Sequence, residues 1–172
     1  MFVRRWVAVW LLGPLVWLVG FPLVHGILPW AISLIGPRFG WANGSPSSWN
    51  FIGLVAVAFG VLTLLWLVIA GSRYARDLPE RVELGWRPQV LITNGPYAYT
   101  RNPIYLSEQA LWFGWAIFFG SLPVLVVISV GMLMGWIFEV VPREERALEA
   151  AFGDTCRAYK AHVPRWIWSR RV

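Results

Sequence analysis

Polar side chains that could do chemistry are rare in this sequence, and they gather in two stretches. The first runs from Gln89 to Glu108 and the second from Glu139 to Arg165. Both stretches combine carboxylates, tyrosines and arginines beside long apolar runs. Residues of this kind at a membrane surface would suit a reaction between a water-soluble cofactor and a lipid-embedded substrate. Composition alone favours the alternative, a small scaffold or transporter subunit.

Other familiar kinds of reactive site are missing from the sequence. It shows no metal-ligand spacing, no phosphate-binding loop and no nucleophile–base pair. Cys156 is the single cysteine, which excludes an intramolecular disulfide framework and is compatible with a reducing cytoplasmic face. We interpret Cys156 as a small apolar residue rather than a nucleophile, and His25 as a packed polar group rather than a base or ligand.

Membrane helices must position these residues. Of the 172 residues 58% are hydrophobic and only 14% are charged, and thirteen are tryptophan. One domain of this length could not cover so much apolar surface with so few charges, so disordered, collagen-like and ordinary globular classes are excluded. The net charge of +6 could suggest nucleic acid, but arginines that flank membrane spans explain it better. We expect no nucleic-acid partner.

Four hydrophobic segments predict an all-α integral membrane protein with about four transmembrane helices. They cover residues 6–35, 51–70, about 103–120 and 122–141, against roughly 20 residues for one span. Pro14, Pro22 and Pro29 predict a kinked or tilted first helix, which we expect to be retained rather than cleaved as a signal peptide. Residues 120–123 read as a tight turn, so the last two spans should form a helical hairpin.

The remaining segments are polar or amphipathic. Residues 71–101 form a polar stretch with a turn at 94–96, and residues 142–162 predict an amphipathic helix. Its apolar face would consist of Ala147, Leu148, Ala151, Phe152, Cys156 and Tyr159. The tail from Arg165 to Trp168 alternates basic and aromatic residues, which is typical of interfacial anchors.

The distribution of basic residues predicts the orientation. In a four-span arrangement, fourteen of the fifteen lysines and arginines fall on one side, and only Arg38 falls on the other. The positive-inside rule then places both termini and residues 71–101 in the cytoplasm.

Two motif blocks carry a resemblance to a known family. The run LITNGPYAYTRNPIY, from Leu91 to Tyr105, resembles the GPY…RHPxY signature of the isoprenylcysteine carboxyl methyltransferase and phospholipid methyltransferase superfamily. About 38 residues later, REERAL followed by FG, a tyrosine and VPR resembles its second block, EExxL…FG…Y…VPR. The resemblance covers residues 89–165. It implies one methyltransferase domain, in which 1–70 supply two spans and 71–172 form the cofactor-binding half with spans 3 and 4.

The resemblance also implies S-adenosylmethionine as the cofactor, bound at the cytoplasmic membrane face. Carried over by position, the cofactor contacts are Gln89, Val90, Leu91, Ile92, Tyr97, Asn102, Pro103, Ile104, Tyr105 and Glu144. The chemistry agrees in kind, because a sulfonium and an ammonium favour a carboxylate such as Glu144 and the faces of tyrosines. We expect Glu145, about 100° further round the helix, to face elsewhere.

Structural alternatives exist for each of these residues. Gly95 and Pro96 could form only a turn, and Pro142 with its two glutamates also resembles a helix start. The tyrosines could be residues of the interfacial belt.

Two departures from the family pattern bear on the methyl acceptor. The usual histidine after the motif arginine is Asn102 here. In the eukaryotic prenylcysteine enzymes of this superfamily, an arginine about one helical turn before the first glutamate is associated with the substrate carboxylate. The aligned residue here is Val140, although Arg143 lies close by. These departures leave a carboxylate, an amine or a thiol open as the acceptor. A carboxylate needs no general base, whereas an amine does, and Glu108 within the third span is the candidate.

The reading we favour is a membrane methyltransferase that acts on a lipophilic acceptor, either an isoprenylcysteine-type carboxylate or a lipid amine, with Glu108 and Arg143 as catalytic residues. The alternatives are a membrane NADPH-dependent reductase of the related sterol-reductase type and a non-enzymatic membrane scaffold. Beyond membrane lipids and the lipophilic or lipidated substrate, no partner is predicted.

Overall fold

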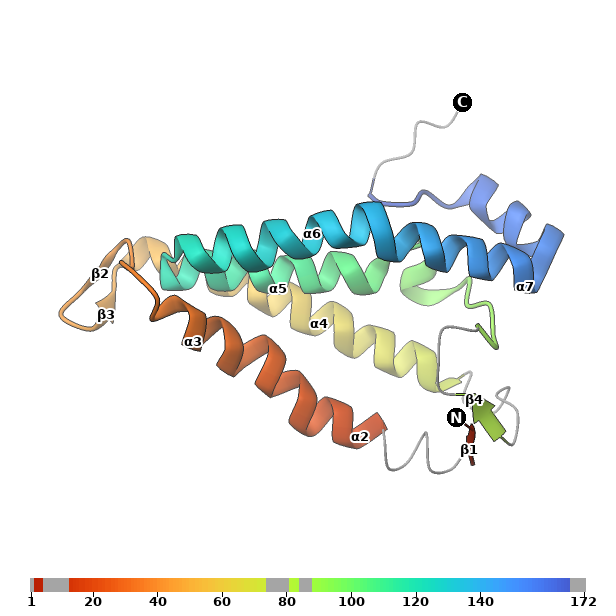
Figure 1. The fold of residues 1–172 in the computed structure, drawn as a ribbon, viewed down its shortest axis with the longest axis horizontal. Coiled ribbons are helices and arrows are strands. Elements are labelled where there is room, and N and C mark those ends of the chain that lie inside the picture. Colours follow the sequence, from red (N-terminus) through yellow and green to blue (C-terminus); the bar gives the residue numbers. More distant parts are fainter. Residues whose placement is uncertain (1, 5–12, 74–80, 84–87, 168–172) are drawn as a thin grey trace.

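The computed structural model describes residues 2–4, 13–73, 81–83 and 88–167, and these residues form four helices (Figure 1). The start of the predicted first span, residues 74–80 and 84–87 of the polar stretch, and Trp168 lie outside the described residues. Figure 1 shows the helices running along the long axis of the molecule, with the predicted turn between α5 and α6 at one end and the polar segments at the other. The described part is therefore helical, as the sequence predicts.

The first helix is continuous through its prolines. It consists of α2 (Gly13–Leu15), the π-helical stretches η2 (Val16–Gly20) and η3 (Leu23–Ile27), and α3 (Leu28–Ser33). Proline has no backbone N–H, and a π-helical turn is one way for a helix to accommodate a missing hydrogen bond. The expected irregularity thus takes the form of widened helical turns.

The second and third helices are packed backbone against backbone. They are α4 (Ile52–Ser72), which follows the 3₁₀ turn η4 (Ser48–Phe51), and α5 (Pro103–Phe119). A Cβ atom on Gly53 would lie 2.3 Å from the carbonyl oxygen of Gly114, and one on Gly60 would lie 2.6 Å from that of Ser107. Small residues that let two helices approach this closely are typical of membrane helix interfaces.

The predicted turn between the third and fourth helices is present. Gly120 ends α5 in a left-handed conformation with φ of 57°, and Ser121 donates its N–H to the Ala116 carbonyl at 3.0 Å. A Cβ atom on Gly120 would lie 1.9 Å from the carbonyl oxygen of Phe39, so only glycine fits. The hairpin expected from residues 120–123 is confirmed.

The fourth helix continues through the predicted start of a separate cytoplasmic helix. Its segments are η7 (Val124–Val130), α6 (Gly131–Gly135), η8 (Trp136–Val140) and α7 (Val141–His162). Pro142 therefore lies inside a continuous helix, and the helix-start interpretation of the following glutamates is wrong. α7 folds back at Gly153, where φ is 52° and ψ is −124° (Figure 1). Its predicted apolar face is buried or half-buried except at Ala151.

Two short antiparallel strand pairs, which the sequence reading missed, join segments outside the bundle. β1 (Phe2–Arg4) pairs with β4 (Arg81–Glu83), and β2 (Trp41–Ala42) pairs with β3 (Ser45–Pro46). The first pair brings the N-terminal segment beside the polar stretch that precedes the first motif block. This contact agrees with the prediction that both segments lie on the same side of the membrane.

Three of the described helices are long and apolar enough to cross a membrane. They span Val16–Ser33, Ser48–Ser72 and Val124–His162. α5 has 17 residues, which corresponds to about 26 Å of helix and is slightly shorter than a typical hydrocarbon core. Large apolar side chains are exposed along the helices, among them Leu18, Val55, Val127 and Phe138. These features are those of a membrane protein.

Candidate functional site

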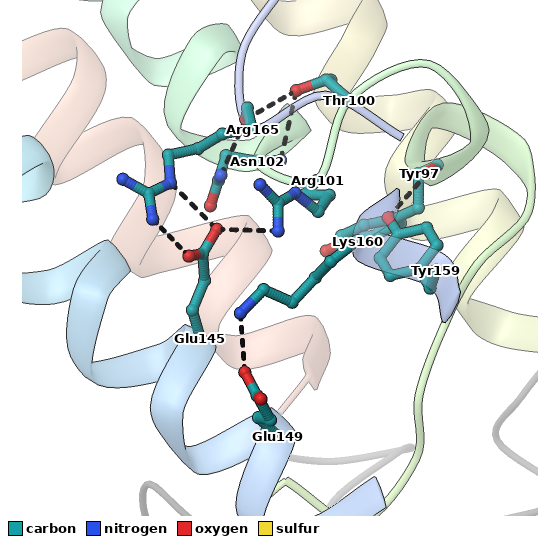
Figure 2. Close-up of polar contacts among 9 residues, drawn as sticks. All are labelled: Tyr97, Thr100, Arg101, Asn102, Glu145, Glu149, Tyr159, Lys160 and Arg165. Carbon is teal, nitrogen blue, oxygen red and sulfur yellow. Dashed lines mark hydrogen bonds and ion pairs between the residues drawn. The ribbon is translucent and has the colours of Figure 1, made fainter. Parts of the chain in front are cut away.

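The two motif blocks meet at the end of the bundle opposite the hairpin turn. Arg101 donates its backbone N–H to the Pro164 carbonyl at 2.9 Å, and both Thr100 Oγ1 and Asn102 Nδ2 donate to the Arg165 carbonyl, at 3.1 and 2.8 Å. Figure 2 shows this clasp, in which the segment before α5 lies against the chain that follows α7. The clasp places the first block beside the second.

A buried carboxylate holds the clasp from the α7 side. Glu145 is 10% exposed and accepts two hydrogen bonds from Arg165, with Nε to Oε1 at 3.0 Å and a terminal nitrogen to Oε2 at 2.5 Å (Figure 2). A terminal nitrogen of Arg101 lies 3.3 Å from Glu145 Oε1. The hydrogen bond to Glu145 raises the pKa of Arg165. The expectation that Glu145 faces away from the site needs correction, because it lines the same cavity as Glu144.

This first cavity has a volume of about 310 Å³, at the lower end of the range of roughly 300–1,000 Å³ for small-molecule sites. All the predicted cofactor-binding residues except Gln89 line it: Val90, Leu91, Ile92, Tyr97, Asn102, Pro103, Ile104, Tyr105 and Glu144. Residues that the sequence reading did not select also line it, among them Arg101, Glu145, Cys156, Tyr159 and Lys160. The structure thus brings together residues that are up to 72 positions apart in the sequence, from Pro88 to Lys160.

Charges of both signs line the cavity. Tyr105 donates its hydroxyl to Glu144 Oε1 at 2.7 Å, and burial together with the negative Glu144 raises the pKa of Tyr97 to about 12. Both phenols therefore remain protonated at neutral pH and can donate. On the cationic side, Arg101 Nε is buried and has no hydrogen-bond partner among the described residues. A wall of this kind suits a ligand that carries both a cationic group and a carboxylate.

Cavity walls also depend on the fold-back of α7. Tyr159, beyond Gly153, donates its hydroxyl to the Tyr97 carbonyl at 2.7 Å, and Lys160 binds Glu149 at 2.7 Å (Figure 2). These contacts hold the last turns of α7 against the turn η6 (Gly95–Ala98) and against the earlier part of α7. The turn predicted at residues 94–96 is present as η6, and it contributes Tyr97 to the site.

A second cavity of about 470 Å³ adjoins the first. Its walls come from the first helix, from α4 and from the start of α5, and Ile92, Tyr97 and Ile104 line both cavities. The lining residues from the first helix and α4 are almost all apolar: Val16, Trp17, Gly20, Phe21, Val24, Leu64, Leu67, Val68 and Gly71. The polar exceptions in this cavity are Tyr97, Glu108 and His25. A space of this composition suits a lipid chain.

The two predicted catalytic residues lie in different surroundings. Glu108 lines the second cavity and is 24% exposed, with Oε1 3.7 Å from His25 Nε2. Arg143 lines neither cavity: it is 63% exposed and forms an ion pair with Glu139, one helical turn earlier. The structure therefore brings Glu108, but not Arg143, to the site.

The comparison with known families decides the class. The sequence profile of the phospholipid methyltransferase family matches residues 48–155, which is well over half of the 172 residues. The chain belongs to the phospholipid methyltransferase family. No curated protein and no solved structure matches the chain.

The family match contains α4, the first motif block, α5 and all of α7 except its last turns. It confirms the resemblance to the methyltransferase superfamily, covers the first block and the second block as far as Gly153, and identifies a membrane methyltransferase. The first helix, which forms one wall of the second cavity, precedes the matched residues.

Proposed function

We propose that this membrane methyltransferase binds S-adenosylmethionine in the first cavity and methylates a lipophilic acceptor whose chain lies in the second. The observation that carries the proposal is the junction of the two cavities. One has charged and hydrogen-bonding walls, the other has almost entirely apolar walls, and Ile92, Tyr97 and Ile104 belong to both. A polar donor and a lipid acceptor require just such adjoining spaces.

The residues present fit the cofactor. Glu144 and the ring of Tyr105 would hold its cationic groups. Arg101, whose Nε has no hydrogen-bond partner within the described part of the chain, and Asn102 would hold its carboxylate and other polar groups. When bound, S-adenosylmethionine supplies an electrophilic methyl group on a sulfonium. Methyl transfer of this kind depends on alignment and charge placement, so the chain's tasks are to hold both ligands and to exclude water.

The acceptor is an isoprenylcysteine-type carboxylate or a lipid amine. A valine at position 140 and an exposed Arg143 offer no cation to an acceptor carboxylate in the second cavity. Among the described residues that line this cavity, Glu108 is the one carboxylate. This arrangement favours the amine.

Calorimetric titration with S-adenosylhomocysteine tests the cofactor site. A hydrogen bond to a charged partner contributes about 1.5–3 kcal/mol, so Glu144→Gln should weaken binding roughly ten- to a hundred-fold. Tyr105→Phe should also weaken it, because the hydroxyl that orients Glu144 is lost. NADPH, titrated into the same protein, should not bind.

Glu139→Gln is the matched control, because Glu139 lies on the same continuous helix but is exposed and lines neither cavity. It should bind S-adenosylhomocysteine as the parent does. If Glu144→Gln binds as tightly as the parent, the cofactor lies elsewhere and the proposed site is wrong.

The single cysteine offers an independent readout of occupancy. Cys156 is buried and lines the first cavity, so a ligand in that cavity would cover its thiol against a small maleimide. Saturating S-adenosylhomocysteine should slow its alkylation at least tenfold, as followed by intact-protein mass spectrometry. Equal rates with and without ligand would contradict binding in this cavity.

We also propose four spans, with α5 as the third, and a cytoplasmic location for both termini, for residues 71–101 and for the active site. Reporter fusions after Val172 should then score as cytoplasmic, and fusions near Ser47 as external. The asymmetry of the basic residues supports this orientation. A cytoplasmic score at Ser47 would exclude the four-span arrangement.

A further inference from the structure

We infer that His25 and Glu108 form a proton-accepting pair that binds the amine headgroup of the acceptor. The inference rests on the proposed function and adds to it a residue from the first helix, which lies outside the matched family residues. It also selects an amine over a carboxylate as the group that is methylated.

The geometry places the pair inside the second cavity. Both side chains line it, both are mostly buried, and His25 Nε2 lies 3.7 Å from Glu108 Oε1. That separation is longer than a direct hydrogen bond, so neither group saturates the other. A headgroup nitrogen that lies beside the two atoms, at the third corner of a triangle, can contact both at ordinary hydrogen-bond distances of about 2.8 Å.

Aromatic packing fixes the imidazole. Its centroid lies 4.5 Å from that of Phe21 in a stacked arrangement, and 5.1 Å from that of Trp112. Phe21 lies one helical turn before His25, and Trp112 lies one turn after Glu108 on α5. The pair therefore occupies one defined place between the first helix and α5.

Charge selects the acceptor. No lysine or arginine lines the second cavity in the described part of the chain, whereas Glu108 supplies a carboxylate. An acceptor carboxylate would meet a like charge in a space with few polar groups, and an ammonium would meet an opposite one. The cavity thus favours a cationic headgroup on a hydrophobic chain.

The chemistry balances with the methyl donor of the proposed function. An ammonium headgroup gives one proton to the pair, and its nitrogen recovers a lone pair. That lone pair forms the new N–C bond while the C–S bond breaks and leaves its electrons on sulfur. The pair then releases the proton to water, and the lipid leaves as a methylammonium.

The first experiment measures binding without any methyl donor. Radiolabelled dodecylamine and dodecanol are titrated onto protein in phosphatidylcholine nanodiscs, with empty nanodiscs correcting for partition into lipid. The parent should bind the amine at least tenfold more tightly than the alcohol, and Glu108→Gln should lose this preference. Equal binding of the two by the parent would overturn the inference.

The second experiment measures turnover with a phospholipid that has a primary amine headgroup, and compares it with farnesylcysteine. His25→Gln and Glu108→Gln should each lower kcat by roughly 10²–10⁴-fold, the usual contribution of a general base. The double variant should fall little further, because the two groups act as a unit. S-Adenosylhomocysteine affinity should stay within about twofold of the parent in all three variants.

His162→Gln and Glu139→Gln are matched controls, since both residues are exposed, and they should retain parental kcat. Methylation of farnesylcysteine but not of the amine lipid, or turnover unchanged in His25→Gln, would overturn the pair and leave the proposed function intact. A parent that fails to bind S-adenosylhomocysteine would instead overturn the proposed function.

Discussion

Gly114→Ala is expected to destabilise the protein by about 3 kcal/mol, the upper part of the usual range for overpacking. The new Cβ atom would lie 2.6 Å from the Gly53 carbonyl oxygen and 2.8 Å from the Val57 backbone nitrogen. Both atoms belong to the backbone of α4, so no side chain can rotate away, and the two helices must separate. Loss of helical circular dichroism on heating in detergent micelles measures the effect.

Gly135→Ala is the control for this prediction. It also adds a methyl group inside a helix, but nothing lies within 4 Å of the new atom. Because alanine is the better helix former by about 1 kcal/mol, Gly135→Ala should leave stability unchanged or raise it slightly. Equal stability of the Gly114 and Gly135 variants would show that α4 and α5 are not packed as described.

Glu145→Gln is expected to cost about 3 kcal/mol, toward the lower end for a broken buried ion pair. The amide preserves the volume of the side chain but leaves the Arg101 and Arg165 guanidinium groups without their counter-charge. Arg165 is 45% exposed and can turn to water, which limits the loss. For a chain of this size, the melting temperature should fall by roughly 6–12 °C.

The contrast with Glu144 gives this prediction its specificity. Glu144→Gln should melt close to the parent but bind S-adenosylhomocysteine weakly, whereas Glu145→Gln should lose both stability and binding, because the clasp around Arg165 opens. Glu149→Gln is the control: its ion pair with Lys160 lies nearer the surface, so this variant should melt close to the parent. If Glu145→Gln melts at the same temperature as the parent, Glu145 does not stabilise the contact between the two motif blocks.

Much of the fold could be predicted because the length of a run without charged residues, and the residue types that form a turn, are local properties of the sequence. The runs without charges marked three of the helices, and Gly120 marked the hairpin. The continuity of the fourth helix was missed because Pro142 and the acidic residues after it satisfy the rules for a helix start equally well. The fold-back at Gly153 was missed for a similar reason, since an isolated glycine in a helical pattern does not reveal its backbone angles.

The candidate site could be predicted from the sequence only at positions that belong to the two motif blocks. Nine of the ten predicted cofactor residues line one cavity, but that prediction came from the resemblance rather than from spacing. The pairing of Glu145 with Arg101 and Arg165 joins three distant positions, and no periodicity in one sequence indicates such a contact. His25 was interpreted as packing because its partner, Glu108, lies on a helix 83 positions later.

The position of the first helix has a consequence for how such an enzyme could diversify. The described residues of this helix line the second cavity, and none of them lines the first cavity, to which the methyl donor is assigned. On the proposed function, mutations along its inner face are expected to change headgroup and chain preference while the donor's binding constant stays the same. Because Ile92, Tyr97 and Ile104 line both cavities, the first helix is the part of the second cavity that can change most independently of the first. Replacing residues 13–33 with those of a relative that has another substrate is therefore the most direct way to redesign selectivity.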